Sequence, residues 1–200
     1  MSKRALSLLV QKIRRCQRCR RPEGSYPVFA PLFPAKVILI GQAPGREETK
    51  KGVPFIGKAG RRLFQWLKEA GIKEEEFRKR VYITQVVKCF FGKGKRGDIK
   101  PNKAIIDACF PYLREEIKRL DPEILIPVGA LAIEKVLGKG KLVSFVGKRF
   151  RVELFARKRF VIPLPHPSGV SVWTYKKENR SRLRKAIGLI KSLFSPPVPG

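Results

Sequence analysis

Short apolar runs alternate along the chain with longer segments in which apolar residues recur every three or four positions. The short runs are rich in β-branched and aliphatic side chains, which is typical of strands buried on both faces of a parallel sheet. They lie at residues 36–40, 81–87, 124–128 and 160–163. The helical spacing occurs at residues 59–70, 103–120, 130–137 and 183–194. This alternation predicts a single three-layer α/β/α domain over residues 1–200, with a central four-stranded, mostly parallel sheet and a loose tail at 195–200.

The chain is strongly basic. Its 45 lysines and arginines stand against only 16 acidic residues, which gives a net charge of +29. A charge of this size repels itself unless a polyanion or dense counterions neutralise it, so nucleic acid is the expected partner. A membrane surface or anionic metabolites are the alternatives, but no single basic amphipathic helix collects these charges.

The apolar pattern predicts neither secretion nor membrane insertion. The only apolar run near the N-terminus, Ala5–Val10, is too short for a signal peptide and is followed directly by basic residues. No stretch approaches the roughly 18 apolar residues that a membrane span requires. We therefore expect a protein that stays inside the cell and has no membrane partner.

The four cysteines are candidate metal ligands. Cys16 and Cys19 form a CxxC pair in an arginine-rich segment, and Cys89 and Cys109 follow far along the chain. These gaps do not suit a compact zinc ribbon, and no histidine lies nearby, so an iron-sulfur cluster held by four distant thiolates fits the spacing better. Two alternatives stay open: Cys89 and Cys109 are ordinary buried thiols, or the chain is a zinc module or an electron carrier. Disulfides are disfavoured inside a cell.

Three segments at the ends of predicted strands are candidates for function, because ligands bind at the carboxyl ends of parallel strands. They are residues 41–45, 84–89 and 164–169. The first predicts a rigid turn with exposed backbone amides, and it lacks the pattern of phosphate-binding and dinucleotide-binding loops. The third holds His166, the only histidine, between two prolines, where an imidazole could donate a proton or stabilise a departing anion. An ordinary structural role is the alternative for each.

Charged residues beside these segments have less specific interpretations. Glu47 and Glu48 follow the first turn, and adjacent carboxylates in a lysine-rich loop are usually solvated. Lys88, at the end of a predicted strand, is expected either to meet a phosphate or to lie in solvent.

Four motifs, taken together with the cysteines, resemble the iron-sulfur uracil-DNA glycosylases of family 4. They are GQAPG at 41–45, GVPFIGKAG at 52–60, VVKC at 86–89 and HPSG at 166–169, and the resemblance runs from about Cys16 to about Trp173. It implies a parallel sheet between helices, a structural 4Fe-4S cluster on Cys16, Cys19, Cys89 and Cys109, and monofunctional hydrolysis of the N-glycosidic bond of uracil in DNA. It also implies a monomeric, cytoplasmic, prokaryotic enzyme associated with the nucleoid; a sliding clamp is a further candidate partner.

The resemblance assigns roles to individual positions. Phe55 would stack on the flipped base, and stacking supplies affinity for any base, so hydrogen bonds must supply identity. His166 would stabilise the uracil anion as the glycosidic bond breaks. Ser168 would contact a phosphate beside the lesion, and Val170 would fill the gap left by the flipped base.

Two positions depart from the family pattern. Gln42 stands where the family usually has a glutamate that positions the attacking water, and Gln85 stands where it has an asparagine that reads the uracil edge. Both changes keep hydrogen bonding, and stabilisation by His166 and by backbone amides near Ala43 could still support cleavage. Three outcomes remain open: uracil excision, a preference shifted to hypoxanthine or xanthine, or damaged-DNA binding without hydrolysis, on single-stranded or double-stranded DNA.

Overall fold

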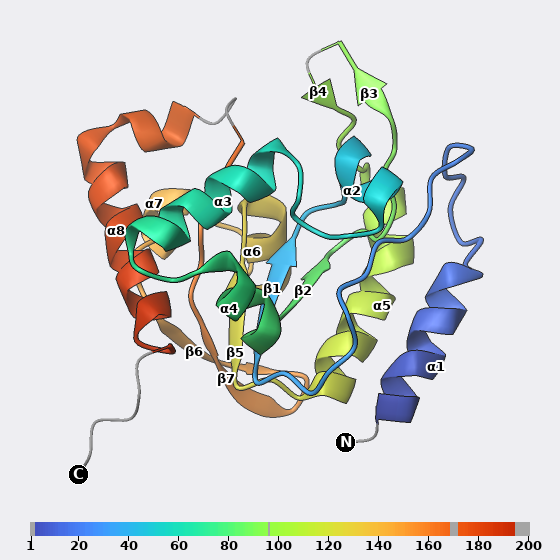
Figure 1. Cartoon of the computed structure of the whole chain (residues 1–200), viewed down its shortest axis with the longest axis horizontal. Coiled ribbons are helices and arrows are strands. Elements are labelled where there is room, and N and C mark those ends of the chain that lie inside the picture. The colour runs from blue at the N-terminus through green and yellow to red at the C-terminus, as the bar shows by residue number, and fades with distance from the viewer. Residues whose placement is uncertain (1–2, 96, 169–171, 195–200) are drawn as a thin grey trace.

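The computed structural model describes residues 3–95, 97–168 and 172–194 (Figure 1). Val170 and the tail at 195–200 lie outside these ranges. Within the described residues, the chain forms a mostly parallel five-stranded sheet between layers of helices, together with a separate two-stranded hairpin. The α/β architecture expected from the alternating pattern is therefore confirmed.

Strands β1 (Val37–Gly41), β2 (Val81–Gln85), β5 (Ile124–Pro127) and β7 (Arg157–Val161) form the parallel part of the sheet, in the order β2-β1-β5-β7. β1 lies between β2 and β5, and its three central residues are completely buried, as expected for a strand covered on both faces. The register pairs Val37 with Val81 and Gly41 with Gln85, so the carboxyl ends of β1 and β2 are level.

The expectation of four strands misses β6 (Phe150–Leu154), which pairs antiparallel with β7 at the edge of the sheet. Arg151 and Glu153 are exposed and alternate with partly buried apolar residues. A half-exposed edge strand does not produce a continuous apolar run, and charged residues on such an edge oppose pairing with other chains. This strand therefore lacks the signal that identifies the four parallel ones.

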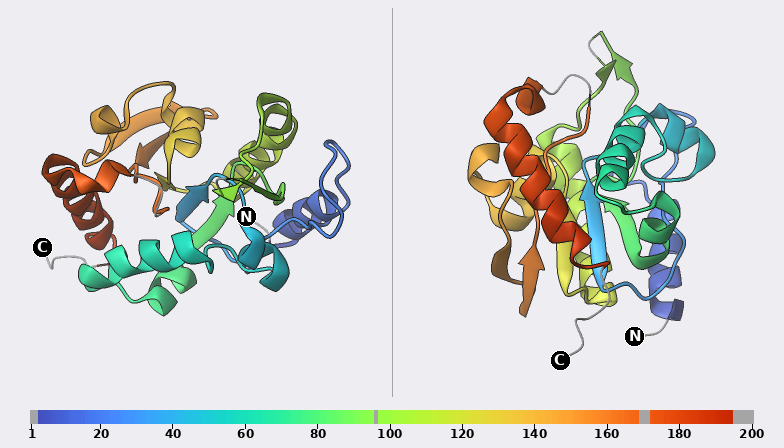
Figure 2. Two further views of the ribbon diagram at one scale, coloured as in Figure 1. Left: turned by 90° about the horizontal axis from the view of Figure 1, so that it is seen from above. Right: turned by 60° about the vertical axis from the view of Figure 1, so that its left-hand side comes forward.

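The four predicted helices are present as α3 (Lys58–Glu69), α5 (Lys103–Leu120), α6 (Ala130–Leu137) and α8 (Lys177–Lys191). Asn102 caps α5, since its side chain accepts a hydrogen bond from the Ile105 backbone N–H at 3.0 Å. In Figures 1 and 2, α3 and α8 cover one face of the sheet and α5 and α6 cover the other. This arrangement follows from right-handed crossovers between parallel strands.

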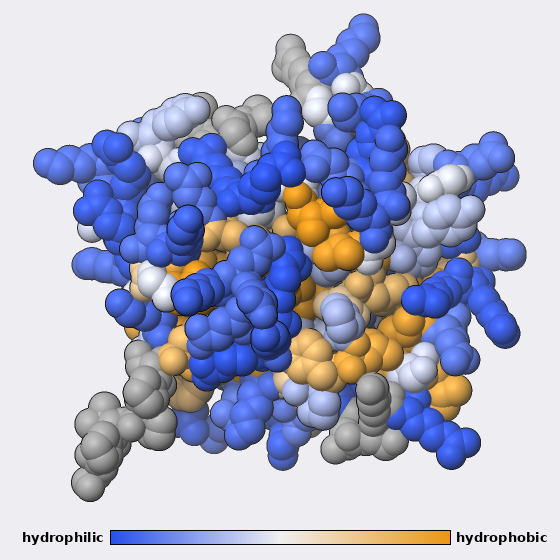
Figure 3. Space-filling model, in the orientation of Figure 1, coloured by the Kyte–Doolittle hydropathy of each residue, from blue (hydrophilic) through white to orange (hydrophobic). Residues whose placement is uncertain are grey.

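The remaining elements were not predicted: α1 does carry apolar residues at helical spacing, whereas the others are short or polar, so periodicity alone does not reveal them. They are α1 (Lys3–Arg14), α2 (Arg46–Lys51), α4 (Glu74–Arg80), α7 (Leu142–Phe145), the 3₁₀ turn Val172–Tyr175, and the hairpin of β3 (Lys93–Gly94) and β4 (Gly97–Asp98). Among the described helices, none has the length and apolar character to cross a membrane. Charged and polar side chains surround the face shown in Figure 3, with apolar side chains visible between them in the middle and lower part of the view.

Candidate functional site at the carboxyl ends of the strands

The three candidate segments meet at one rim of the sheet. The backbone N–H groups of Val86 and Val87 donate to the carbonyls of Gly41 and Gln42, each at 2.9 Å, and this joins the segment after β2 to the turn after β1. On the other side of β1, the Gly129 N–H donates to the Leu164 carbonyl at 2.9 Å, which joins the ends of β5 and β7. The predicted convergence of residues 41–45, 84–89 and 164–168 is therefore present in the structure.

The Phe55 ring lies directly against the end of β1. A Cβ atom on Gly41 would be only 2.8 Å from two carbons of this ring and 3.6 Å from Cγ of Gln85. Any side chain at position 41 would therefore displace the ring, which explains the glycine that follows the first apolar run. Phe55, which comes from the loop between α2 and α3, and Gln85, which ends β2, face the same point on the rim.

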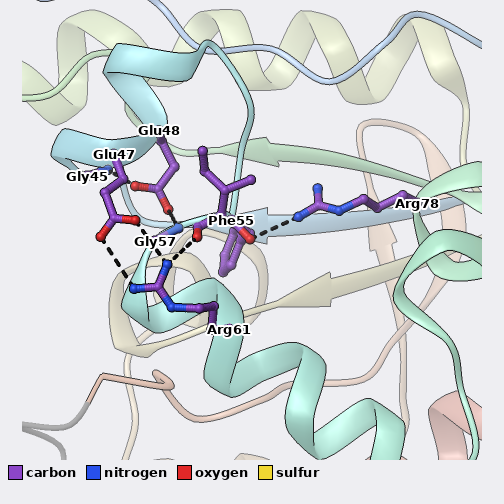
Figure 4. Close-up of polar contacts among 8 residues, drawn as sticks. Gly45, Glu47, Glu48, Phe55, Gly57, Arg61 and Arg78 are labelled. Carbon is purple, nitrogen blue, oxygen red and sulfur yellow. Dashed lines mark hydrogen bonds and ion pairs between the residues drawn. The ribbon is translucent and has the colours of Figure 1, made fainter.

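Phe55 has a left-handed backbone, with φ of 55°, which is uncommon for a bulky side chain. Arg78 on α4 holds this conformation: its guanidinium donates to the Pro54 carbonyl at 2.9 Å and to the Phe55 carbonyl at 2.9 Å. Figure 4 shows the bond to Phe55. The loop also packs against α3, because a Cβ on Gly60 would lie 1.9 Å from the Phe55 carbonyl oxygen. The ring position is thus set by contacts from two helices.

Glu48 ties the first turn to the Phe55 loop. Its carboxylate accepts hydrogen bonds from the backbone N–H of Gly45 at 3.1 Å and of Gly57 at 2.9 Å (Figure 4). The side chain is buried, so the expectation of a solvated residue is wrong for Glu48, because two backbone donors replace water around its carboxylate. Glu47 is exposed as expected and pairs with Arg61 at 3.0 Å.

Gln85 is the most unusual polar residue of the rim. Only 1% of its surface is exposed, and neither its amide nitrogen nor its amide oxygen has a hydrogen-bond partner among the described residues. An unpaired buried amide costs about 1–3 kcal/mol, so such groups are rare and call for an explanation. A ligand that offers one acceptor and one donor at this position would satisfy both atoms.

The ring of His166 lies over Gly129 at the end of β5. The Ser168 backbone N–H donates to Nδ1 of His166 at 3.2 Å. A backbone N–H can only donate, so Nδ1 is unprotonated and Nε2 carries the proton of the neutral ring. Burial lowers the pKa of His166, and the positive charge of Lys100 lowers it further. The ring is therefore a neutral donor through Nε2.

The other predicted rim residues take these places. Gln42 is half-buried immediately after β1, and its backbone carbonyl is used by Val87. Ala43 is also half-buried and packs against the core. Ser168 is half-buried beside His166, which it contacts through its backbone. Trp173 packs partly buried against the core.

All four cysteines line one cavity at the end of β2. Cys16 and Cys19 follow α1, Cys89 follows β2, and Cys109 lies on α5; Ile13, Pro27 and Tyr112 also line the cavity. Burial, together with the nearby Cys109, raises the pKa of Cys89 to about 11. Burial also raises the pKa of Cys109, although the positive charge of Lys88 opposes this. Neutral, buried thiols of this kind would lose their protons on binding a metal.

The surroundings of the cavity suit a cluster of irons bound by thiolates. The backbone N–H of Lys88 donates to Sγ of Cys109 at 3.3 Å, that of Arg18 donates to Sγ of Cys16 at 3.4 Å, and Arg21 lies near Cys89. Hydrogen bonds and positive charge at the sulfurs stabilise an anionic iron-sulfur centre. In the described part of the chain, no three His, Cys, Asp or Glu side chains are close enough to share one ion.

A buried ion pair lies between this cavity and the rim, where sequence reasoning expects none. Lys88 Nζ contacts Oε2 of Glu116 on α5 at 2.5 Å, and the two side chains are 1% and 0% exposed. The expectation that Lys88 meets a phosphate or solvent is therefore wrong. Its partner lies far along the chain, so no local signal marks the pair.

Fold and rim together define an α/β protein with a ligand site at the carboxyl ends of its parallel strands. A scan against protein families matches residues 27–188 to the uracil DNA glycosylase superfamily. Among curated proteins, the type-4 uracil-DNA glycosylase of Saccharolobus solfataricus is 30% identical, over 96% of this chain and 88% of its own length. That of Archaeoglobus fulgidus is 29% identical over 92% of both, and that of Thermotoga maritima is 29% identical over 91% of this chain and 88% of its own.

The chain belongs to the uracil DNA glycosylase superfamily and, within it, to the type-4 group. The family resemblance carried by the four motifs is thereby confirmed. The match begins at residue 27, after the CxxC pair, and the curated relatives extend it over the N-terminal segment.

Proposed function

We propose that this protein removes uracil from DNA by hydrolysing its N-glycosidic bond, which leaves an abasic site. Family membership supports the reaction, and one structural observation carries the assignment to this rim. The buried amide of Gln85 has no hydrogen-bond partner among the described residues and lies beside the Phe55 ring. A flipped uracil presents a flat ring and an edge with carbonyl oxygens and an N–H, which would satisfy both groups at once.

Recognition would divide between these two residues. The Phe55 ring would stack on the flipped base, a contact worth about 1–3 kcal/mol whichever base is present. The Gln85 amide would read the base edge, because a base that cannot pair with it leaves a buried polar group unsatisfied. Stacking therefore supplies affinity and the amide supplies identity.

His166 would act on the leaving base. As the glycosidic bond breaks, negative charge develops on the uracil ring, and a neutral imidazole with its proton on Nε2 can donate a hydrogen bond to that charge without losing the proton. The Ser168 N–H fixes this tautomer, and burial keeps the ring neutral at physiological pH. Water then attacks the sugar cation. Gln42 would orient this water, and the backbone amide of Ala43 would add to the stabilisation.

Contacts outside the pocket would hold the DNA. Ser168 would contact a phosphate beside the lesion, and Val170 would occupy the gap left in the stack. Lysines and arginines around the rim would neutralise phosphates, in keeping with the net charge of +29. We further propose that the protein acts as a monomer in the prokaryotic cytoplasm, at the nucleoid, with a sliding clamp as a candidate partner.

Cys16, Cys19, Cys89 and Cys109 would hold a 4Fe-4S cluster. When bound, such a group supplies a covalent tie between the segment after α1, the end of β2 and α5. No step of the base excision uses it.

A second candidate is the same reaction on another deaminated base. The observation that favours it is the pair of glutamines, Gln42 and Gln85, which stand where the family usually has glutamate and asparagine. Gln85 offers the same donor and acceptor on a longer arm, and this moves the reading group by one methylene. Hypoxanthine or xanthine could then meet the amide in place of uracil.

Single-turnover cleavage of oligonucleotides that carry one uracil, hypoxanthine or xanthine tests both candidates, in single-stranded and in duplex form. Alkali reveals the abasic product, and His166→Ala serves as the matched variant. We expect product from uracil that falls by at least about a hundredfold with His166→Ala, the scale of losing one electrostatic donor. Tight damage-selective binding without product from any substrate would refute the glycosylase assignment.

A further inference from the structure

The buried ion pair of Lys88 and Glu116 lies at the centre of a closed polar network. Lys88 Nζ donates to the Thr84 hydroxyl and to the Gln85 carbonyl, both at 2.7 Å, in addition to Glu116. The Glu116 carboxylate also accepts from the hydroxyls of Thr84 at 2.8 Å and Tyr82 at 3.2 Å. All five residues are at most 2% exposed. The network is therefore shielded from water, and each of its bonds is strong.

This network fixes the backbone from which the base-reading amide projects. The Gln85 carbonyl is held by Lys88, and the next two residues donate their N–H groups to the carbonyls of Gly41 and Gln42 at 2.9 Å. In the peptide between Gln85 and Val86, Lys88 thus holds the carbonyl oxygen and Gly41 of β1 holds the N–H. The side-chain amide of Gln85 has no hydrogen-bond partner among the described residues. The position of this side chain therefore depends on the contacts of its backbone and on packing.

Lys88 also reaches the cysteine cavity, and Glu116 lies on the helix that carries Cys109. Lys88 lines it and donates its backbone N–H to Cys109 Sγ at 3.3 Å, and it directly precedes Cys89. Glu116 lies seven residues after Cys109 on α5, which is two helical turns and so the same face of the helix. One ion pair therefore connects the wall of the cysteine cavity to the floor of the base site.

Stability alone does not account for such a pair. Removing two charges from water is costly, and replacing a buried ion pair by uncharged side chains of similar volume is often neutral or stabilising. What the pair does supply is a fixed geometry. We propose that Lys88 and Glu116 are positioning residues for base recognition, which set Gln85 from the cysteine side of the sheet. This inference rests on the proposed function, and it adds to that function a source of base selectivity outside the pocket.

The test is a double variant, Lys88→Met with Glu116→Gln, which removes both charges and leaves no unpaired ion. The amide introduced at position 116 can still accept from Tyr82 and donate to Thr84, whereas the Gln85 carbonyl loses its cation. Selectivity is measured as the ratio of affinities for duplexes that carry uncleavable 2′-fluoro-2′-deoxyuridine or thymidine at one position. Single-turnover excision of uracil, the visible absorption of the cluster and the thermal midpoint are measured alongside. Tyr82→Phe is the matched control, because it removes one bond to Glu116 but leaves the contact between Lys88 and Gln85.

We expect the double variant to fold and to keep its visible absorption, while the selectivity for uracil falls at least about tenfold, since small misplacements of a reading group weaken recognition strongly. Tyr82→Phe should keep the selectivity of the parent. A folded double variant with unchanged selectivity would overturn the inference and leave the pair a purely structural feature.

Two further comparisons keep the test decisive. If the double variant does not fold, Thr84→Val takes its place, because it removes the hydroxyl that contacts both Lys88 and Glu116. We expect it to cause a smaller loss of selectivity, about threefold. A folded Thr84→Val protein with parental selectivity refutes the inference. The proposed function is judged separately on the parent protein. A parent that neither excises uracil nor prefers the uracil analogue would refute both.

Discussion

Arg78 supports the site without touching its ligand, so its replacement gives a sharp test of how the Phe55 ring is held. In Arg78→Met, the unbranched side chain can still pack on Phe64, over which the guanidinium lies at 4.5 Å from the ring centroid. It cannot donate to the carbonyls of Pro54 and Phe55. The left-handed backbone of Phe55 then loses its two strongest contacts from α4, and the loop can relax to an ordinary conformation.

The size of the effect follows from these contacts. A hydrogen bond to a charged group contributes about 1.5–3 kcal/mol, and relief of a left-handed backbone returns about 1–3 kcal/mol. The Arg78 side chain is 24% exposed and also pairs with Glu74, so part of the gain is screened by solvent. We therefore expect the free energy of unfolding to fall by roughly 2–4 kcal/mol, which lowers the midpoint by roughly 5–15 °C for a chain of this size.

The catalytic effect is expected to act through Phe55. Partial loss of a stacking contact worth about 1–3 kcal/mol should lower kcat/KM for uracil about tenfold. A double-mutant cycle with Phe55→Leu separates this route from a general loss of stability, because two residues that act through one contact give non-additive effects. Lys79→Met, which removes an exposed cation of the same helix, is the control and should change neither quantity. An Arg78→Met protein that loses stability but keeps parental kcat/KM would refute the reasoning.

Four further outcomes are expected. Gln85→Met should raise stability by about 1–2 kcal/mol, because an unpaired buried amide is removed, while uracil excision falls about a hundredfold or more; retained excision in this more stable variant would contradict the reading role. Burial lowers the pKa of His166 in the folded chain, so between about pH 7 and pH 5 the unfolded chain binds a proton that the folded chain does not. Stability therefore falls as the pH is lowered through this range. Thermal melts of His166→Gln should lose this part of the pH dependence of stability. Cys89→Ser should abolish the visible absorption of the purified protein and lower its midpoint, whereas a colourless parent that contains zinc would refute the cluster. Binding to duplex DNA should weaken steeply with salt, by about 0.9 in the logarithmic slope for each phosphate contact, and a flat dependence would exclude the rim lysines as phosphate ligands.

The parallel sheet and its covering helices are readable from the sequence because their signal is local. Residues 36–40 form an apolar run because β1 is covered on both faces, and the stripe on α8 exists because one face of that helix packs against the core. Strand β6 escapes detection for the converse reason: at an edge only one face is covered, and charged side chains interrupt the pattern. The hydrophobic pattern of a segment therefore indicates how many of its faces are buried.

The rim itself is predictable only in part. Its three segments follow from the positions of the strand ends, and the roles proposed for Phe55 and His166 rest on motif resemblance. The residues that support the rim cannot be predicted from the sequence, because each depends on a partner that the fold brings near. Glu48 accepts from the backbone amide of Gly57, and Lys88 pairs with a carboxylate of α5. Composition rules place such charges in solvent, and only the folded chain shows the donors and counter-charges that replace water.

Arg78 and Lys88 act in the same way, and their contacts explain why the rim can hold residues that lower stability. The left-handed backbone of Phe55 and the unpaired amide of Gln85 are each unfavourable in the free protein. Arg78 constrains the first from α4, and Lys88 constrains the backbone of the second from beneath the sheet. Both supports are in place in this structure, so we expect an entering base to meet groups that are already oriented and lose little entropy on binding. It follows that changes in the supports should act on the uracil reaction more strongly than on binding to undamaged DNA, which uses the surface cations instead.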